Sequence, residues 1–200
     1  FNRLYPGVEV RLTEGNIFYL EERLAHGDLD LLLDNHPMDP QIYQQELFCA
    51  EQLLLAVSPS QSPASGLAAQ RLSHADILAG KHLLAETPAV SLEQFRSCAF
   101  IALRQGNDTR MDLMCEQAGF SPRLQLEVDQ LSTAYNIVCN GMGITLVSDT
   151  LVTRTPAPVG VEYYKLSSPH AGRFAYFYYK HSSYVTRAMR EFIQTASNRL

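Results

Sequence analysis

The spacing of apolar residues changes from every second position to every third or fourth, and back again, within the first 33 residues. Alternation over residues 8–13 predicts a strand. Asn16 then stands where a helix N-cap belongs, and Gly27 is placed to end that helix. The short apolar run Leu29–Leu33 predicts a second strand that is covered on both faces. The pattern is therefore typical of a β–α–β unit in a parallel sheet.

Strands and helices continue to alternate along the rest of the chain. The segment 58–66, with two prolines and four serines, is the least regular, and one or two short helices are expected between it and Gly80. Helices are expected over 111–118, 131–138 and 185–196. Strands are expected over 43–49, 53–57, 82–85, 98–103, 124–128, 144–147, 161–166 and 174–179. This order predicts an α/β protein of two lobes, with the chain crossing twice between them and loops at strand carboxyl ends lining a ligand crevice.

Composition and charge narrow the class of protein. The 200 residues are 46% hydrophobic, which is enough for one large core or two small ones. No apolar run approaches the roughly 18 residues that cross a bilayer, and no signal peptide is visible. The net charge of −5 argues against this segment binding nucleic acid by itself. Because residues 1–4 resemble the last turn of a helix, we expect that an upstream segment is missing.

The residue types that carry catalysis or bind metals are not arranged in a recognisable motif. No nucleophile elbow, phosphate-binding loop or zinc-protease motif occurs, so an enzyme is not predicted and no cofactor is expected. The six histidines form no pair three or four positions apart, which disfavours a metal site. The cysteines are either buried reduced thiols or a redox-sensing pair. They are Cys49, Cys98, Cys115 and Cys139.

Several loops that join a strand end to a helix start are candidate ligand contacts. The segment 106–110 opens a helix, where unpaired backbone N–H groups attract an anion; the alternative is ordinary capping by Asn107 or Asp108. Ser132 and Thr133 open the next helix, as contacts for a ligand carboxylate or as caps. The aromatic run 176–179 is interpreted as strand core rather than a stacking site. The candidate contacts are Asn16, Asn35, Gly106, Asn107, Asp108, Thr109, Arg110, Leu131, Ser132 and Thr133.

Several short motifs, taken in order, resemble the effector-binding (substrate-binding) domain of bacterial LysR-type transcriptional regulators. Their order and spacing hold over nearly the whole chain. They are Tyr5-Pro6-Gly7-Val8, Leu12-x-Glu14-Gly15, Leu24-x-x-Gly27-x-Leu29-Asp30, Leu54-Leu55-Ala56-Val57-Ser58-Pro59, Phe100-Ile101, Gly106-Asn107-x-x-Arg110, Gly119-Phe120-x-Pro122 and Val138-x-x-Gly141-x-Gly143-Ile144-x-Leu146-Val147.

The resemblance implies two Rossmann-like lobes with mixed sheets, of the periplasmic-binding-protein type II kind. Lobe I would comprise residues 1–52 and 169–200, and lobe II residues 53–168, with the effector held between them. The family's module begins with a strand that this chain lacks, so we expect lobe I to be completed by an upstream segment or a neighbour. Three departures are Ser148 where proline is usual, a long connection over 60–95, and Asn35 where some relatives carry a charged ligand contact.

The resemblance also implies a function and partners. The expected function is a cytoplasmic, effector-sensing regulatory domain that controls transcription, with DNA bound through an absent N-terminal winged helix-turn-helix domain. The expected partners are a small-molecule effector and a second copy of the chain, in a homodimer that becomes a tetramer in the full-length protein. No membrane is expected as a partner. In that dimer the helix 109–118 and the strand 124–128 would face the partner's first-lobe helix and strand 8–13. The alternative is a solute-binding protein of the same fold that delivers its ligand to a transporter.

Overall fold

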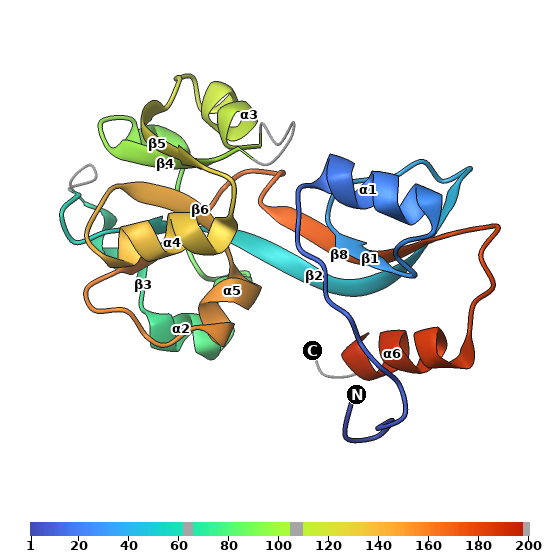
Figure 1. Cartoon of the computed structure of the whole chain (residues 1–200). Coiled ribbons are helices and arrows are strands. Elements are labelled where there is room, and N and C mark those ends of the chain that lie inside the picture. The colour runs from blue at the N-terminus through green and yellow to red at the C-terminus, as the bar shows by residue number, and fades with distance from the viewer. Residues whose placement is uncertain (62–65, 105–109, 198–200) are drawn as a thin grey trace. The chain divides into compact units, whose positions relative to one another are not determined.

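The computed structural model describes residues 1–61, 66–104 and 110–197, which form two compact units (Figure 1). Unit 1 comprises Phe1–Ala50 and Phe174–Leu200, and unit 2 comprises Glu51–Arg173. The chain passes from unit 1 to unit 2 within strand β2 (Tyr43–Val57) and returns within strand β8 (Gly172–Lys180). No helix among these described residues is long and apolar enough to cross a bilayer.

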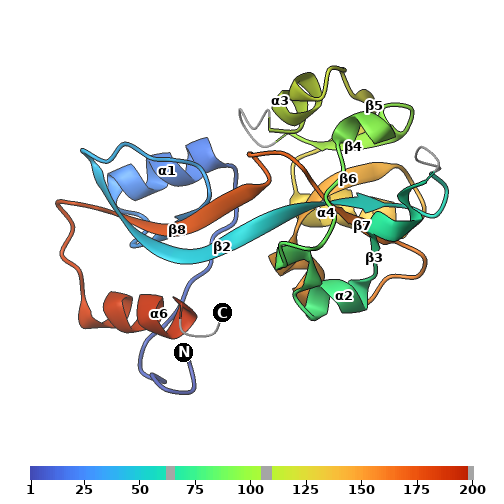
Figure 2. The same ribbon diagram turned by 180° about the vertical axis from the view of Figure 1, so that it is seen from behind.

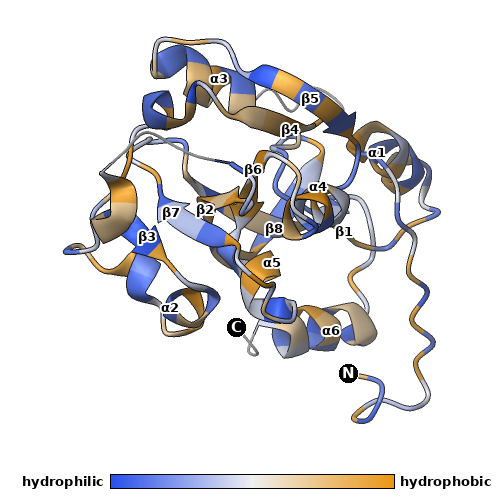
Figure 3. Ribbon diagram, turned by 90° about the vertical axis from the view of Figure 1, so that its left-hand side faces the viewer, coloured by the Kyte–Doolittle hydropathy of each residue, from blue (hydrophilic) through white to orange (hydrophobic). Residues whose placement is uncertain are grey.

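Unit 1 is a small sheet with one helix on each face. Strand β8 lies between β1 (Leu32–Asp34) and the first part of β2, and β1 is antiparallel to β8. Helix α1 (Ile17–His26) and helix α6 (Arg187–Ser197) lie on opposite sides of these strands (Figures 1 and 2). Polar and apolar residues are mixed along α6, as expected of a helix with only one buried side (Figure 3).

The aromatic run of β8 forms the core of unit 1 on both faces. Tyr178 packs with the α1 side, together with Ile17 and Leu24. Phe177 and Tyr179 pack with the α6 side, against Met189 and Ile193. Successive strand residues point to opposite faces, so one strand supplies both cores. The interpretation of this run as strand core is confirmed.

The expected β–α–β start of the chain is wrong. Residues 8–16 form no helix or strand, and Leu12 is 94% exposed. Strand β1 is shorter than the apolar run suggested, and its pairing with β8 is antiparallel. A strand needs a neighbour for its backbone N–H and C=O groups, and within the described part of unit 1 no strand pairs with residues 8–13. The expectation that a further strand completes this lobe stays a prediction.

Unit 2 is built on a mixed sheet in the order β3–β7–β2–β6–β4–β5. Strand β4 is parallel to its neighbours β5 and β6, whereas β2 is antiparallel to β6 and β7. The strands are β3 (Arg71–Leu72), β4 (Ala99–Leu103), β5 (Arg123–Val128), β6 (Ile144–Ser148) and β7 (Glu162–Lys165). The helices are η1 (Leu67–Gln70), α2 (His74–Leu78), η2 (Lys81–Leu83), η3 (Leu92–Phe95), α3 (Arg110–Gln117), α4 (Leu131–Cys139) and α5 (Asp149–Arg154).

Helices cover both faces of this sheet. On one face, Met111, Met114 and Cys115 of α3 pack with η3 and the strands. On the other face, Ala134, Tyr135 and Val138 of α4 pack with residues of α2 and α5. In β2, Leu54 and Leu55 belong to different cores, as the two-residue period of a strand requires. The prediction of an α/β fold with mixed sheets is confirmed.

Three predictions in this part of the chain need correction. The two strands expected over 43–49 and 53–57 are one continuous strand, β2. Residues 82–85 form no strand, because Gly80 has a φ of 71° and starts the 3-10 turn η2. Helix α5, which the sequence did not predict, begins at Asp149 because the Ser148 side chain accepts a hydrogen bond from the backbone N–H of Leu151. The expected helices over 111–118, 131–138 and 185–196 are confirmed, with ends that shift by one or two residues.

Burial makes the thiols of Cys98 and Cys115 unreactive. Cys115 is fully buried and Cys98 is 2% exposed. Burial raises the pKa of the Cys98 thiol, and it raises the pKa of Cys115 to about 12. Since the thiolate is the reactive form, these two side chains behave as small apolar residues at neutral pH, which favours the interpretation as structural thiols.

Candidate functional site

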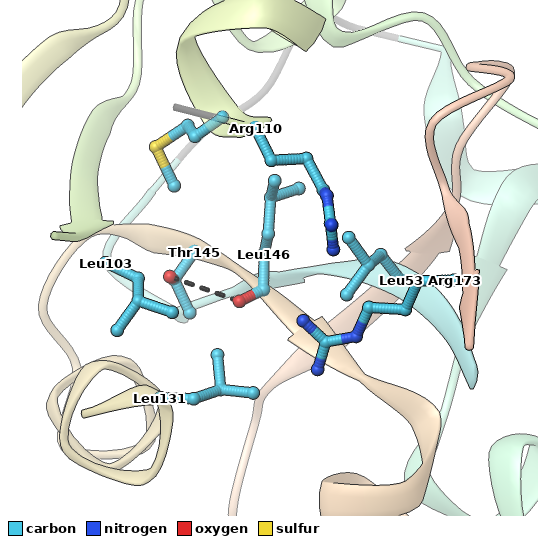
Figure 4. Close-up of a pocket in the computed structure, with 8 residues that line it drawn as sticks. Leu53, Leu103, Arg110, Leu131, Thr145, Leu146 and Arg173 are labelled. Carbon is cyan, nitrogen blue, oxygen red and sulfur yellow. Dashed lines mark hydrogen bonds between the residues drawn. The ribbon is translucent and has the colours of Figure 1, made fainter. Parts of the chain in front are cut away.

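A pocket lies in unit 2 at the edge of the sheet where strands β4 and β6 end. Leu103 is the last residue of β4, Arg110 the first of α3 and Leu131 the first of α4. Ligands of open α/β sheets bind outside the carboxyl ends of parallel strands, which is the position of this pocket. Its lining residues are Leu53, Leu103, Arg110, Met111, Leu131, Thr145, Leu146 and Arg173 (Figure 4).

The order of the strands brings these helix starts together. Strand β4 runs parallel to both of its neighbours, β5 and β6. The chain leaves β4 through α3 and leaves β5 through α4, and these helices cover opposite faces of the sheet. Both helices therefore begin at the same edge of the sheet, and their first residues line one pocket.

Two arginines bring positive charge into a mostly apolar lining. Arg110 extends into the pocket from α3, and Arg173 extends into it from the start of β8 (Figure 4). Arg173 Nε lies 2.5 Å from Glu51 Oε2, and each of these two side chains is 11% exposed. A guanidinium group binds planar oxyanions through paired N–H donors, so the pocket suits a ligand with a negatively charged group.

A further arginine, Arg104, follows the last residue of β4 and is paired with two carboxylates. The Arg104 guanidinium lies 2.5 Å from Asp112 of α3 and 2.5 Å from Glu127 of β5. These two hydrogen-bonded carboxylates raise the pKa of Arg104. Arg104 thus ties the end of β4 to α3 and β5, and it positions the start of α3 beside the pocket.

Glu51 is held in place by the start of helix α5. Its second carboxylate oxygen accepts a hydrogen bond from the Thr150 hydroxyl. The neighbouring Asp149 accepts hydrogen bonds from the backbone N–H of Gln52 at 3.0 Å and of Thr150 at 2.8 Å. The buried His82 ring lies 3.0 Å from the other oxygen of Asp149. This polar cluster joins β2 to the beginning of α5.

The pocket is small in this conformation. Its volume is about 30 Å³, which is room for about one water molecule. The buried Thr145 hydroxyl donates a hydrogen bond to the Ile101 carbonyl at 2.8 Å, so it is engaged within the sheet. A larger ligand therefore requires the lining side chains to rearrange.

The structure brings two of the predicted contacts together in the lining of the pocket. Arg110 and Leu131 both line it, whereas the exposed Ser132 and Thr133 are not lining residues. Asn16 caps α1, where its side-chain oxygen accepts a hydrogen bond from the Tyr19 N–H at 3.0 Å. Asn35 directly follows β1 in unit 1. Gly106, Asn107, Asp108 and Thr109 lie outside the described residues.

Sequence reasoning missed the ion pair between Arg173, which lines the pocket, and Glu51. Arg173 stands at the start of an aromatic strand, and Glu51 stands 122 positions earlier in the middle of β2. Neither residue belongs to a local motif. Each residue is a charged position just before an apolar run, and this pattern does not show which residue it pairs with. In the part of the chain that the structure describes, no three His, Cys, Asp or Glu side chains gather as a metal site.

Two α/β units joined by the strands β2 and β8, with a pocket at the carboxyl ends of parallel strands, define a class of small-ligand-binding domains. Comparison with family models gives the particular family. The LysR substrate binding domain model matches residues 1–200. The chain therefore belongs to the LysR substrate binding domain family, and the resemblance noted in the sequence is confirmed.

Related proteins and solved structures agree with this assignment. The chain is 26% identical over 203 residues to YcgK, an uncharacterized HTH-type transcriptional regulator of Bacillus subtilis strain 168, covering 98% of this chain and 59% of YcgK. The regulatory domain of Synechocystis PCC6803 CcmR, solved in complex with 2-PG, has the same fold, with a TM-score of 0.74, 16% identity and coverage of 99% and 86% of the two chains. The C-terminal domain of a probable LysR family regulator from Rhodococcus sp. RHA1 has a TM-score of 0.73 and 19% identity, with coverage of 98% and 87%.

Proposed function

We propose that this chain is the effector-sensing part of a transcription regulator, and that its effector binds in the pocket at the carboxyl ends of β4 and β6. The convergence of Arg110 and Arg173 in an apolar pocket at this edge is the observation that carries the proposal. Family membership favours it over a solute-binding protein that serves a transporter. Binding would stabilise one conformation of the domain over others and so change how the whole regulator acts.

DNA binding by the whole protein belongs to the proposal as well. The chain spans 59% of the length of YcgK, whose name describes a regulator of the HTH type. We propose a DNA-binding helix-turn-helix domain outside this segment, in a cytoplasmic protein. The net charge of −5 is consistent with a segment that binds a ligand while another part of the protein binds DNA.

Replacing Arg110 by glutamine tests the position of the effector site. A thermal-shift screen of metabolite acids, amino acids and aromatic compounds is expected to give at least one ligand that stabilises the chain, by about 2.7 kcal/mol at a concentration of 100 Kd. The R110Q variant is expected to bind this ligand at least tenfold more weakly, because a charged hydrogen-bond donor is lost from the pocket. Calorimetric titration measures the change.

Arg96→Gln is the matched control, since its side chain is 62% exposed on the surface and Arg96 does not line the pocket. It removes the same charge and should leave the affinity unchanged. The site assignment is wrong if R110Q binds the ligand as tightly as the unmodified chain. The sensing function itself is contradicted if no compound of the screen stabilises the protein.

We further propose that a second copy of the chain covers the surface of α3 and β5. Strand β5 is the edge of the unit 2 sheet, and its side chains Leu124 and Leu126 are 37% and 41% exposed. Leu113 of α3 is 39% exposed. The partner's segment 8–13, in which Val10 is 44% and Leu12 94% exposed, is proposed to meet them. Exposed edges and apolar patches of this kind favour association.

Leu126→Lys tests this association. The charged side chain is expected to weaken the dimer at least tenfold, because it would be desolvated at the interface, while the monomer stays folded. Sedimentation velocity over a concentration series measures the change. The control is Leu78→Lys, at a leucine of α2 that is 56% exposed. A chain that remains monomeric without any substitution refutes the dimer.

A further inference from the structure

The Glu51–Arg173 pair is built so that its arginine can be shared with a ligand. Glu51 receives the Nε donor of Arg173 on one oxygen and the Thr150 hydroxyl on the other. Its carboxylate therefore keeps a hydrogen bond even when Arg173 turns toward another partner. Arg173 has further N–H donors, and its guanidinium group extends into the pocket (Figure 4). Removing both charged groups from water costs free energy, so a contribution to stability alone is a weak explanation for a nearly buried ion pair at this position.

The rest of the lining restricts what a ligand can present to these donors. Apart from the two arginines and Thr145, the lining side chains are leucines and a methionine. The Thr145 hydroxyl already donates to the Ile101 carbonyl. Recognition by side chains therefore depends on the guanidinium groups, which pair best with a planar oxyanion. The apolar side chains favour a short hydrocarbon body attached to that group.

We propose that the pocket takes a small carboxylate with an apolar body, and that Glu51 acts as a resident counter-ion that sets its affinity. This inference rests on the proposed function, in which the same pocket binds the effector. The ligand carboxylate and Glu51 both draw on the charge of Arg173, and two negative groups on one guanidinium repel each other in a poorly solvated site. Glu51 thus raises the Kd for the carboxylate, so the pocket is occupied only at high ligand concentration.

The test uses straight and branched monocarboxylates of three to six carbons, each paired with its amide, and alkyl phosphates of the same chain lengths. The amide has nearly the shape of the acid but no charge. Calorimetric titration of the whole chain is expected to find a carboxylate that binds at least a hundredfold more tightly than its amide. Glu51→Gln is expected to bind that carboxylate at least tenfold more tightly, with the affinity for the amide unchanged.

Two further variants complete the design. Glu93→Gln removes one negative charge from an exposed carboxylate that does not line the pocket, so its affinities should match those of the unmodified chain. Arg173→Lys keeps the positive charge beside Glu51 but loses the planar pair of donors, and it should bind the carboxylate at least tenfold more weakly. If Glu51→Gln fails to fold, as judged by circular dichroism, Arg173→Lys decides the question. Because Glu51 acts on the ligand only through Arg173, an Arg173→Lys variant that binds the carboxylate as tightly as the unmodified chain overturns the inference.

The outcomes separate this inference from the proposed function. An amide that binds as tightly as its acid, equal affinities in Glu51→Gln and the unmodified chain, or a panel without any binder overturns the inference. An alkyl phosphate that binds more tightly than every carboxylate also overturns the stated ligand class. In each case, a neutral or phosphorylated ligand whose affinity depends on Arg110 would leave the proposed function standing.

Discussion

Replacing Phe100 by alanine is expected to lower the free energy of unfolding by about 3–5 kcal/mol. The Phe100 side chain is fully buried in β4, the strand between β5 and β6, and its ring lies 6.0 Å from that of Phe120. Removing the ring leaves a cavity that the surrounding strands are too constrained to fill. Since domains are stable by only about 5–15 kcal/mol, this loss is a large part of the total.

Urea denaturation followed by circular dichroism measures this loss as a lower midpoint with an unchanged slope. Phe18→Ala is the matched control, because the Phe18 side chain is 51% exposed on α1. It should cost less than about 1 kcal/mol. A Phe100→Ala protein as stable as this control would show that β4 is not the centre of the unit 2 core.

Replacing Gly143 by alanine is expected to cost about 2–5 kcal/mol, because left-handed strain and overpacking add. Gly143 has a φ of +65°, and a Cβ atom there would lie 2.8 Å from the Ala99 carbonyl oxygen and 3.0 Å from two carbons of Ile101. The oxygen belongs to the backbone of β4, so the clash cannot be relieved by turning a flexible side chain. The same displacement would reach Thr145, which is hydrogen-bonded to Ile101 and lines the pocket.

Gly141→Ala separates strain from crowding. Gly141 has a φ of +93°, but nothing lies within 4 Å of the position of its Cβ. This variant should therefore show only the conformational cost, about 1–2 kcal/mol. Thermal denaturation of both variants under the same conditions compares them. Equal losses would mean that the close approach of Gly143 to β4 has no energetic consequence.

Periodicity predicted the helices better than the strands. The apolar faces of α3 and α4 are encoded within eight or nine consecutive residues, so the sequence alone locates them. The strand expected over 8–13 failed because alternation records which side chains share a face and says nothing about a neighbouring strand. Likewise, Glu51 and Gln52 looked like a break between two strands, whereas their polar groups bond to α5 and Arg173 within a continuous β2.

The candidate site was predictable only where it coincides with a helix start. Arg110 was proposed because unpaired N–H groups at a helix N-terminus attract an anion. Leu131 was proposed because it opens the helix whose Ser132 and Thr133 hydroxyls could contact a ligand carboxylate. Leu53, Thr145 and Leu146 are buried inside strands, where a residue of the pocket and one of the core occupy the same kind of position in the sequence. Arg173 lies at the start of β8, far along the chain from the other lining residues, and no local sequence pattern indicates that it reaches the pocket.

The continuity of β2 has a consequence for how this protein can be divided. Tyr43–Ala50 belongs to the sheet of unit 1 and Glu51–Val57 to that of unit 2, although both are parts of a single strand of 15 residues. Cutting the chain at this boundary would divide β2 between two fragments. The second boundary between the units lies inside β8, so a cut there would divide that strand as well. The two units are therefore poor candidates for independent expression, insertion or exchange between relatives, and they are best treated as one inherited folding module.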